Sequence, residues 1–322
     1  MSGHDLVALG EVMLRLAAPP PQRLGQTASL DVQVGGAEAN VAAACARLGL
    51  RTALISALPA DHAWGDRTVR EMAGHGVDCA GVLRRPRTRM GVYFLEYGVA
   101  PRPVRVLYDR RDSALSRLVP EEVDWALVRG ARMIHLSGVT AALGPNLRDV
   151  LRRALDEAAG AGVPVSFDVN FRSRLWGPRE AREFLVEILP RLHHLFIGAD
   201  DAATVFELTG APAAALAELS KLAPRATIAL TLGEAGSAVL AGGAVVRPSK
   251  LYSVTLVDRV GAGDAYAAGF LWAALCGRTT QEAVDAATAL AALKCTIWGD
   301  VPLVTRAELD ELLASDSTEI RR

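Results

Sequence analysis

From about residue 129 onward, short apolar runs alternate with longer amphipathic runs. In chain order these segments are ARMIHLSG, NLRDVLRRALDEAAGAG, VPVSFDVN, REAREFLVEILPRL and HLFIG. Short apolar runs are typical of buried strands, and the longer runs repeat their apolar residues at helical spacing. Strands that alternate with helices form βαβ units around a parallel sheet. This half of the chain therefore predicts an α/β fold.

The last third continues the pattern. ATIALTLG predicts another strand, SAVLAGGAVVR predicts a hairpin, and helices are expected over about 264–276 and 280–294. Thr279 and Glu282 have the spacing of a capping box, which satisfies backbone amides at the start of a helix.

The first third is less regular. DLVALGEVMLRLA and SLDVQVGG predict strands, and AEANVAAACARLGL predicts a helix. RMGVYFLEYG and VRVLYDR then predict two strands without a helix between them. We expect these extra strands, within about 11–36 and 88–112, to form a small β-sheet that lies apart from the main sheet as a lid.

Composition excludes several classes of protein. The 322 residues carry a formal net charge of -1, so no overall positive field attracts nucleic acid or an anionic membrane. No apolar run approaches the roughly 18 residues of a membrane span, and the start lacks a signal-like segment. We therefore expect a cytoplasmic protein. The cysteines form no CxxC pair and the histidines no HExxH, which argues against structural zinc and a disulfide framework.

Three polar clusters are candidates for a ligand site, since open parallel sheets bind ligands beyond the carboxyl ends of their strands. They are GGAEAN at 35–40, DVNFR at 168–172 and GAGD at 261–264. In DVNFR, the period of two along a strand places Asp168, Asn170 and Arg172 on one face. Taken alone, DVNFR is also explained as a solvated strand end, and GGAEAN as a turn that leads into a helix.

The GAGD cluster predicts an anion site. Its glycines allow close backbone approach, and the following helix presents unpaired amides and the positive end of its dipole. No GxxxxGK[ST] is present, which excludes a P-loop. Beside a bound phosphoryl group, Asp264 could accept the proton of an attacking hydroxyl. The alternative is that Asp264 is only the N-cap of the helix.

Together the motifs resemble the ribokinase-like (PfkB) carbohydrate kinases, from about residue 5 to 313. The segments that carry the resemblance are GGAEANVAAACARLG, SFDVNFRSRLW, TLGEAGSAVL and VDRVGAGDAYAAGF. Within the family, GVYFLE, YDRRDSA, HLSGV and the late WGD are most similar to the 2-keto-3-deoxygluconate kinases. The resemblance implies one domain over 1–322, with a doubly wound, mostly parallel sheet flanked by helices and a small β-sheet lid.

The resemblance also implies the roles of individual residues. Asp264 is the expected catalytic base, and Gly261, Ala262 and Gly263 the expected backbone anion hole. The expected sugar contacts are Gly36, Asn40, Tyr93, Tyr108, Arg110, Arg172 and Asp300. The nucleotide is expected along Asn170, Thr231, Gly233, Gly236, Gly261 and Gly263, and Mg²⁺ near Asp201. Taken one at a time, Tyr93, Tyr108 and Arg110 are better explained as ordinary strand residues.

The sequence departs from the family pattern at several positions. Arg259 replaces a common threonine, Gly198 and Ala199 replace polar and acidic residues of the metal-associated segment, and Thr288 replaces a common asparagine near the adenine. Arg15 stands where ribokinases and fructokinases carry a sugar-binding aspartate, which argues against a neutral polyol substrate.

The resulting expectation is an enzyme that uses ATP and Mg²⁺ to phosphorylate the primary hydroxyl of a 2-keto-3-deoxy sugar acid. Its partners would be the sugar acid and ATP, with no nucleic acid or membrane, and a homo-oligomer stays open. One alternative is a kinase of fructose, ribose or tagatose phosphate. Another is a non-catalytic sugar-binding relative, which the departures at Gly198 and Ala199 favour and the intact GAGD loop opposes.

Overall fold

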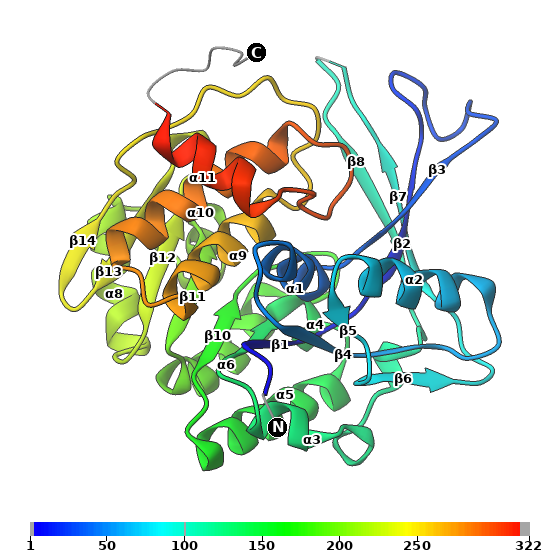
Figure 1. Ribbon diagram of the computed structural model, residues 1–322, viewed down its shortest axis with the longest axis horizontal. Coiled ribbons are helices and arrows are strands. Elements are labelled where there is room, and N and C mark those ends of the chain that lie inside the picture. Colours follow the sequence, from blue (N-terminus) through cyan, green and yellow to red (C-terminus); the bar gives the residue numbers. More distant parts are fainter. Residues whose placement is uncertain (1–2, 100, 316–322) are drawn as a thin grey trace.

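The computed structural model describes residues 3–99 and 101–315. The strands of the main sheet in this part of the chain are β1 (Leu6–Leu9), β4 (Thr52–Pro59), β5 (Val77–Asp78), β6 (Val82–Arg85), β9 (Ile134–Ser137), β10 (Val165–Asp168), β11 (His194–Gly198), β12 (Thr227–Thr231), β13 (Ser237–Ala241) and β14 (Ala244–Val246). They lie in the order β14-β13-β12-β11-β10-β9-β1-β4-β5, with β6 also paired to β4 (Figure 1). All pairs from β12 to β5 are parallel, and β13 and β14 form the predicted antiparallel hairpin.

Helices cover both faces of this sheet. They are α1 (Ala37–Arg47), α2 (Ala63–Gly74), α3 (Trp125–Arg129), α4 (Gly138–Ala141), α5 (Pro145–Ala161), α6 (Pro178–Ile188), α7 (Ala199–Phe206), α8 (Pro212–Leu222), α9 (Ala262–Leu275), α10 (Thr280–Cys295) and α11 (Arg306–Ala314). One hydrophobic core joins the sheet to α3–α8, and a second joins its other face to α1 and α9–α11. The doubly wound α/β class is therefore confirmed.

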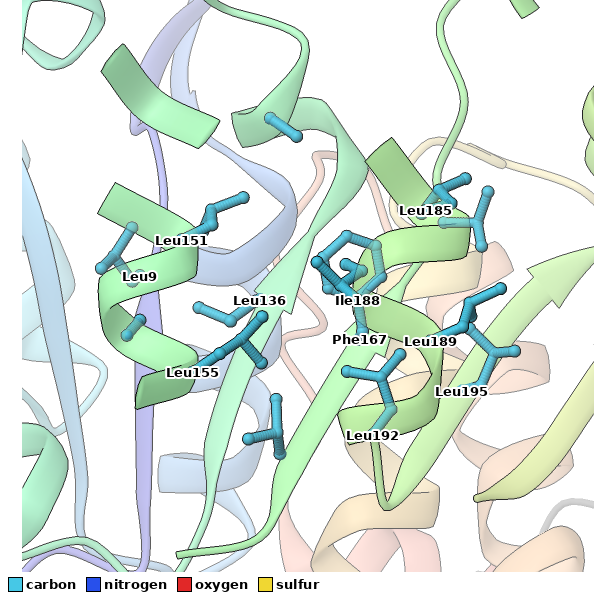
Figure 2. Close-up of a cluster of buried hydrophobic side chains, with 14 of the residues drawn as sticks. Leu9, Leu136, Leu151, Leu155, Phe167, Leu185, Ile188, Leu189, Leu192 and Leu195 are labelled. Carbon is cyan, nitrogen blue, oxygen red and sulfur yellow. The ribbon is translucent and has the colours of Figure 1, made fainter. Parts of the chain in front are cut away.

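Alternating side chains of single strands supply the two cores. In β11, Leu195 and Ile197 belong to the first core, whereas Phe196 between them belongs to the second and packs against Phe270 of α9. Figure 2 shows the first core, in which Phe167 of β10 is surrounded by leucines and isoleucine of neighbouring elements. Because both faces of the parallel strands are covered, they are continuous apolar runs in the sequence.

A second, four-stranded sheet is formed by β2 (Met13–Ala17), β3 (Asp31–Gly35), β7 (Gly91–Glu96) and β8 (Arg105–Asp109), in the order β3-β2-β7-β8. It projects from the upper right of the main sheet in Figure 1. All four strands fall within the ranges expected for the small sheet. The run DLVALGEVMLRLA contributes to both sheets, because it breaks after β1 and continues as β2.

Several helices and strands of the structure were not predicted from the sequence. The longest strand among them is β4, a buried eight-residue strand beside β1. The helices α2, α7, α8 and α11 were also not predicted. The capping box at Thr279 and Glu282 is confirmed at the start of α10. Within residues 3–99 and 101–315, no helix combines the length and apolarity needed to cross a membrane.

The order of the strands locates a crevice. After β1 the chain continues to β4 and β5 on one side, whereas β9 and the later strands lie on the other side of β1. Strand order thus reverses between β1 and β9, and ligands of such sheets bind at the carboxyl ends of strands beside the reversal.

Candidate active site

A cavity of about 840 Å³ lies between the carboxyl ends of the main sheet and the small sheet. It is lined by the ends of β10, β11 and β12, by the first turns of α1, α7 and α9, and by β2, β7 and β8. Predicted site residues that line it are Gly36, Asn40, Tyr93, Tyr108, Arg110, Asn170, Arg172, Asp201, Thr231, Gly261, Ala262, Gly263, Asp264 and Asp300. Gly233 and Gly236 lie outside the lining, in the turn that follows Thr231.

The GAGD segment forms the first turn of α9. Gly261 is the N-cap and has φ +83°, and a Cβ there would lie 2.2 Å from the carbonyl oxygen of Asp300. The amide of Ala262 already donates to the carbonyl of Arg259 (3.2 Å), and the first intrahelical bond runs from Ala265 to Gly261 (2.8 Å). The amides of Gly263 and Asp264 lie between these two. They are too close to the start of the helix to have an intrahelical acceptor. Gly263 thus stays among the candidate anion donors and Asp264 is added, whereas the amide of Ala262 is already bonded.

Gly263 leaves room for a ligand at this turn. A Cβ at this position would meet no protein atom within 4 Å, so the space in front of the helix N-terminus is open. A helix N-terminus with open space before it fits a phosphate group.

Asp264 is the third residue of α9, so the N-cap alternative is wrong. Its Oδ2 accepts a hydrogen bond from Asn40 Nδ2 (2.7 Å), and Asn40 Oδ1 accepts from the amide of Gly36 (3.3 Å). Burial raises the pKa of Asp264 to about 7, and the nearby carboxylate of Asp300 adds to the rise. A carboxylate with a pKa near neutrality is suited to accept and release a proton.

The DVNFR segment converges on the same cavity, although for a different reason from the one expected. Strand β10 ends at Asp168, and Asn170 has φ +41°, so the period of two does not extend to Arg172. A turn instead brings Asp168, Asn170 and Arg172 to the cavity wall. The backbone of this turn is held by Asp201, whose Oδ2 accepts from the amide of Phe171 (3.0 Å).

Carboxylates concentrate on this wall. Burial raises the pKa of Asp168 well above its usual range, and the neighbouring Asp264 and Asp201 raise it further. Burial also raises the pKa of Asp201. Across the described part of the chain, no three His, Cys, Asp or Glu side chains are grouped to hold a metal ion by themselves. The donor set therefore fits a hard cation that takes most of its ligands from water and phosphate.

The two arginines expected to bind substrate have different surroundings. Arg110 is buried, and its Nε donates to Glu11 Oε2 (2.7 Å), so its charge is compensated. Arg172 is partly buried, and the hydrogen bond of its side chain to another described residue runs to the backbone carbonyl of Phe171 (3.1 Å). Tyr93 and Tyr108 pair across β7 and β8, with ring centroids 5.9 Å apart.

Arg15 lies behind the cavity, outside its lining. Its guanidinium is fully buried and donates to Asp300 Oδ1 (2.5 Å), to Asp258 Oδ2 (2.6 Å) and to the hydroxyl of Tyr97. Asp300 in turn accepts from the hydroxyl of Tyr93. Arg15 therefore orients Asp300 from behind, and any effect it has on substrate choice is indirect.

Sequence reasoning missed several charged residues around the site. Glu38 is buried and accepts from Ser137 Oγ and Thr140 Oγ1, each at 2.6 Å, and burial raises its pKa. Glu11 and Asp258 were missed as well. All three are acids inside otherwise apolar or glycine-rich segments. Because burying a charge is costly unless it is paired, an acid in such a segment could have been identified as a candidate site residue.

The ribokinase-like fold and the carboxylate at a helix N-terminus define a class, the sugar kinases with a small second sheet. The family model "pfkB family carbohydrate kinase" matches residues 4–302. The chain therefore belongs to the pfkB family of carbohydrate kinases. Full-length relatives named as kinases set aside the alternative of a non-catalytic protein.

Relatives in this family span the whole chain. A 2-dehydro-3-deoxygalactonokinase of Haloferax volcanii is 36% identical over 318 residues, 99% of each chain. A 2-dehydro-3-deoxygluconokinase of Thermoproteus tenax is 32% identical over 96% of this chain and 94% of its own. The crystal structure of the 2-dehydro-3-deoxygluconokinase of Thermotoga maritima superposes with a TM-score of 0.92 at 35% identity, covering 97% of this chain and 99% of that one.

Proposed function

We propose that this kinase transfers the γ-phosphoryl group of ATP to the primary hydroxyl of a 2-keto-3-deoxy sugar acid, of the gluconate or galactonate type. The observation that carries the proposal is Asp264, a carboxylate with a raised pKa beside the open N-terminus of α9. Full-length relatives named for the 2-dehydro-3-deoxy gluconate and galactonate reactions support the substrate class. The small sheet would act as the lid that excludes water.

In the proposed reaction, Asp264 accepts the proton of the sugar hydroxyl as its oxygen attacks the γ-phosphorus. The new O–P bond forms while the bond to the β,γ-bridging oxygen breaks, and ADP leaves with that electron pair. The amides of Gly263 and Asp264 would stabilise negative charge on the phosphoryl group in flight. The nucleotide would extend from this turn past Asn170 and Thr231 toward Gly233 and Gly236.

Mg²⁺ would lie near Asp168 and Asp201 and neutralise phosphate charge there. The raised pKa values of both carboxyls fit this placement, because a nearby cation favours the ionised form that burial disfavours. Gly198 and Ala199, which lack side-chain ligands, leave Asp201 as the acid of this segment that lines the cavity.

Recognition of the sugar carboxylate is assigned to Arg172. An anionic group buried under a lid needs charge-assisted donors. Arg110 already compensates Glu11, whereas no carboxylate lies within ion-pair distance of Arg172 in the described residues. Of these two arginines, Arg172 is the one without a carboxylate at ion-pair distance. Its charge also acts on the carboxyls of the cavity wall, Asp168, Asp201 and Asp264.

Arg172→Ala should lower kcat/KM for 2-keto-3-deoxygluconate by about 10- to 150-fold, which corresponds to about 1.5–3 kcal/mol for a hydrogen bond to a charged group. Fructose should lose much less, since it has no carboxylate. An ADP-release assay over a panel of sugars and sugar acids measures both. Arg179→Ala, which removes an exposed arginine paired with Glu183, is the control. An equal loss for both sugars, or a wild type that prefers fructose, would contradict the substrate assignment.

The pKa of Asp264 predicts the pH dependence of turnover. The base must be ionised to accept a proton, so kcat/KM should fall about tenfold per pH unit below about 7 and level off above it. A pH profile of kcat/KM measures this limb in the free enzyme. A profile that stays flat to pH 5 would show that a group with the ordinary pKa of an aspartate, ~3.9, limits the reaction.

A further inference from the structure

Lys294, in the last turn of α10, is fully buried. Lysines are almost never buried without a partner. Its Nζ donates to two backbone carbonyls, those of Asp258 (3.0 Å) and Ile297 (3.2 Å). No carboxylate lies within ion-pair distance of this ammonium in the described residues, and burial lowers its pKa. The ammonium is thus held by main-chain oxygens rather than by a salt bridge.

The two carbonyls belong to segments that build the active site. Asp258 opens the turn that leads to Gly261 and α9, and its Oδ1 accepts from the amide of Val260 (3.0 Å). Ile297 opens the segment that ends at Asp300, whose carbonyl oxygen packs against Gly261. Lys294 therefore joins the segment 297–300, which carries Asp300, to the start of the anion-binding turn, the residues 258–261 before α9.

Other contacts tie the same two segments together. The amides of Val257 and Asp258 donate to the carbonyl of Cys295, at 2.9 and 3.2 Å. The amide of Gly299 donates to Asp258 Oδ2 (3.1 Å), on which Arg15 also converges. The bonds to the carbonyl of Cys295 involve main-chain atoms alone, so they form whatever residue stands at 294. The link between the carbonyls of Asp258 and Ile297 depends on the side chain of Lys294.

The position of Lys294 also has an electrostatic consequence. The buried carboxylates of Asp258 and Asp300 lie close to the anion-binding turn, and both act on the ammonium. A cation at this point offsets negative charge behind a site that must accept phosphate. Arg15 offsets the same carboxylates from the side of the small sheet.

We propose that Lys294 is a positioning residue for phosphoryl transfer. Its buried ammonium fixes the carbonyls of Asp258 and Ile297 relative to each other, and so holds the N-terminus of α9 in the geometry that receives the transferred group. The inference rests on the proposed phosphoryl transfer at Asp264. It requires no contact between Lys294 and either substrate, and Lys294 is outside the cavity lining.

Lys294→Met removes the charge and the donors but keeps a long apolar chain. We expect kcat to fall about 10²-fold with KM for the sugar unchanged, because a displacement of about 1 Å at the reacting group costs this much. Lys294→Gln, which keeps one short neutral donor, should lose less. The control is Lys250→Met, since Lys250 Nζ also donates to a backbone carbonyl, that of Ser315 (2.8 Å), but at the surface.

Steady-state kinetics and thermal unfolding are measured together, on whichever sugar the wild type phosphorylates. A wrong substrate assignment thus leaves the test of Lys294 intact. A kcat within threefold of the Lys250→Met control, or a rise in KM without a fall in kcat, would overturn the proposal. Insolubility of both Lys294 variants beside a soluble control would assign Lys294 to stability alone and would overturn it as well.

Discussion

Replacing Asp264 by asparagine is expected to lower kcat by about 10²–10⁴-fold, the usual contribution of a general base. The fold should persist, because the amide oxygen of asparagine can still accept from Asn40. Purified variant and wild type are compared in the coupled ADP-release assay at saturating sugar and ATP. Near-normal turnover would remove Asp264 from the reaction.

The same variant should be at least as stable as the wild type at neutral pH. Since burial raises the pKa of Asp264 to about 7, the folded state binds its proton more tightly than the unfolded state does. The contribution of this group to stability is therefore greatest below the unfolded pKa and is lost as the pH rises toward about 7. Asparagine carries no charge and avoids that loss. The combination of equal or higher stability and low activity would separate a catalytic role from a structural one.

Glu282 provides a matched control for Asp264. It is also the third residue of a helix, but it is exposed and completes the capping box of α10 with Thr279. Glu282→Gln should leave kcat near the wild-type value and change stability little, because glutamine can still complete the capping box. A comparable loss of activity in both variants would point to helix ends in general rather than to proton transfer.

Arg15→Met is expected to destabilise the folded protein by about 3–5 kcal/mol, because loss of one partner leaves buried charges uncompensated. Asp258 and Asp300 are both buried and both bonded to this guanidinium. Thermal unfolding should show a lower midpoint for the variant. The deficit should shrink as the pH is lowered, because burial raises the pKa of Asp300 and protonation removes its uncompensated charge.

Arg152→Met tests whether burial causes that loss. Arg152 also bonds two carboxylates, those of Asp149 and Glu187, but all three side chains are exposed to solvent. Such pairs contribute about 0–1 kcal/mol, so this variant should unfold close to the wild type. If Arg15→Met is no less stable than Arg152→Met, the network behind the cavity does not stabilise the fold.

Local patterns were sufficient for two of the turns that line the site. The glycine-rich turn before α9 and the turn after β10 were found because each combines a short apolar strand or small-residue helix with polar residues at its end. The strand β4 was missed, although it is a fully buried strand that pairs with β1. Its run TALISALP mixes polar and small residues, and burial on both faces comes from neighbours distant in sequence.

The sequence by itself determined the βαβ alternation, the glycine turn and the presence of Asp264 within it, because these depend on residues that are close along the chain. Only the tertiary structure decided which charged side chains form ion pairs. The sequence does not distinguish Arg110 from Arg172 as a cation for the substrate. Both line the cavity, but folding places Glu11 against Arg110 and leaves no carboxylate at ion-pair distance from Arg172 in the described residues. It also moved Arg15 behind Asp300 and brought Asn40 to Asp264, 224 residues away. Pairing and desolvation depend on contacts across the fold, and these set the charge and pKa of each group.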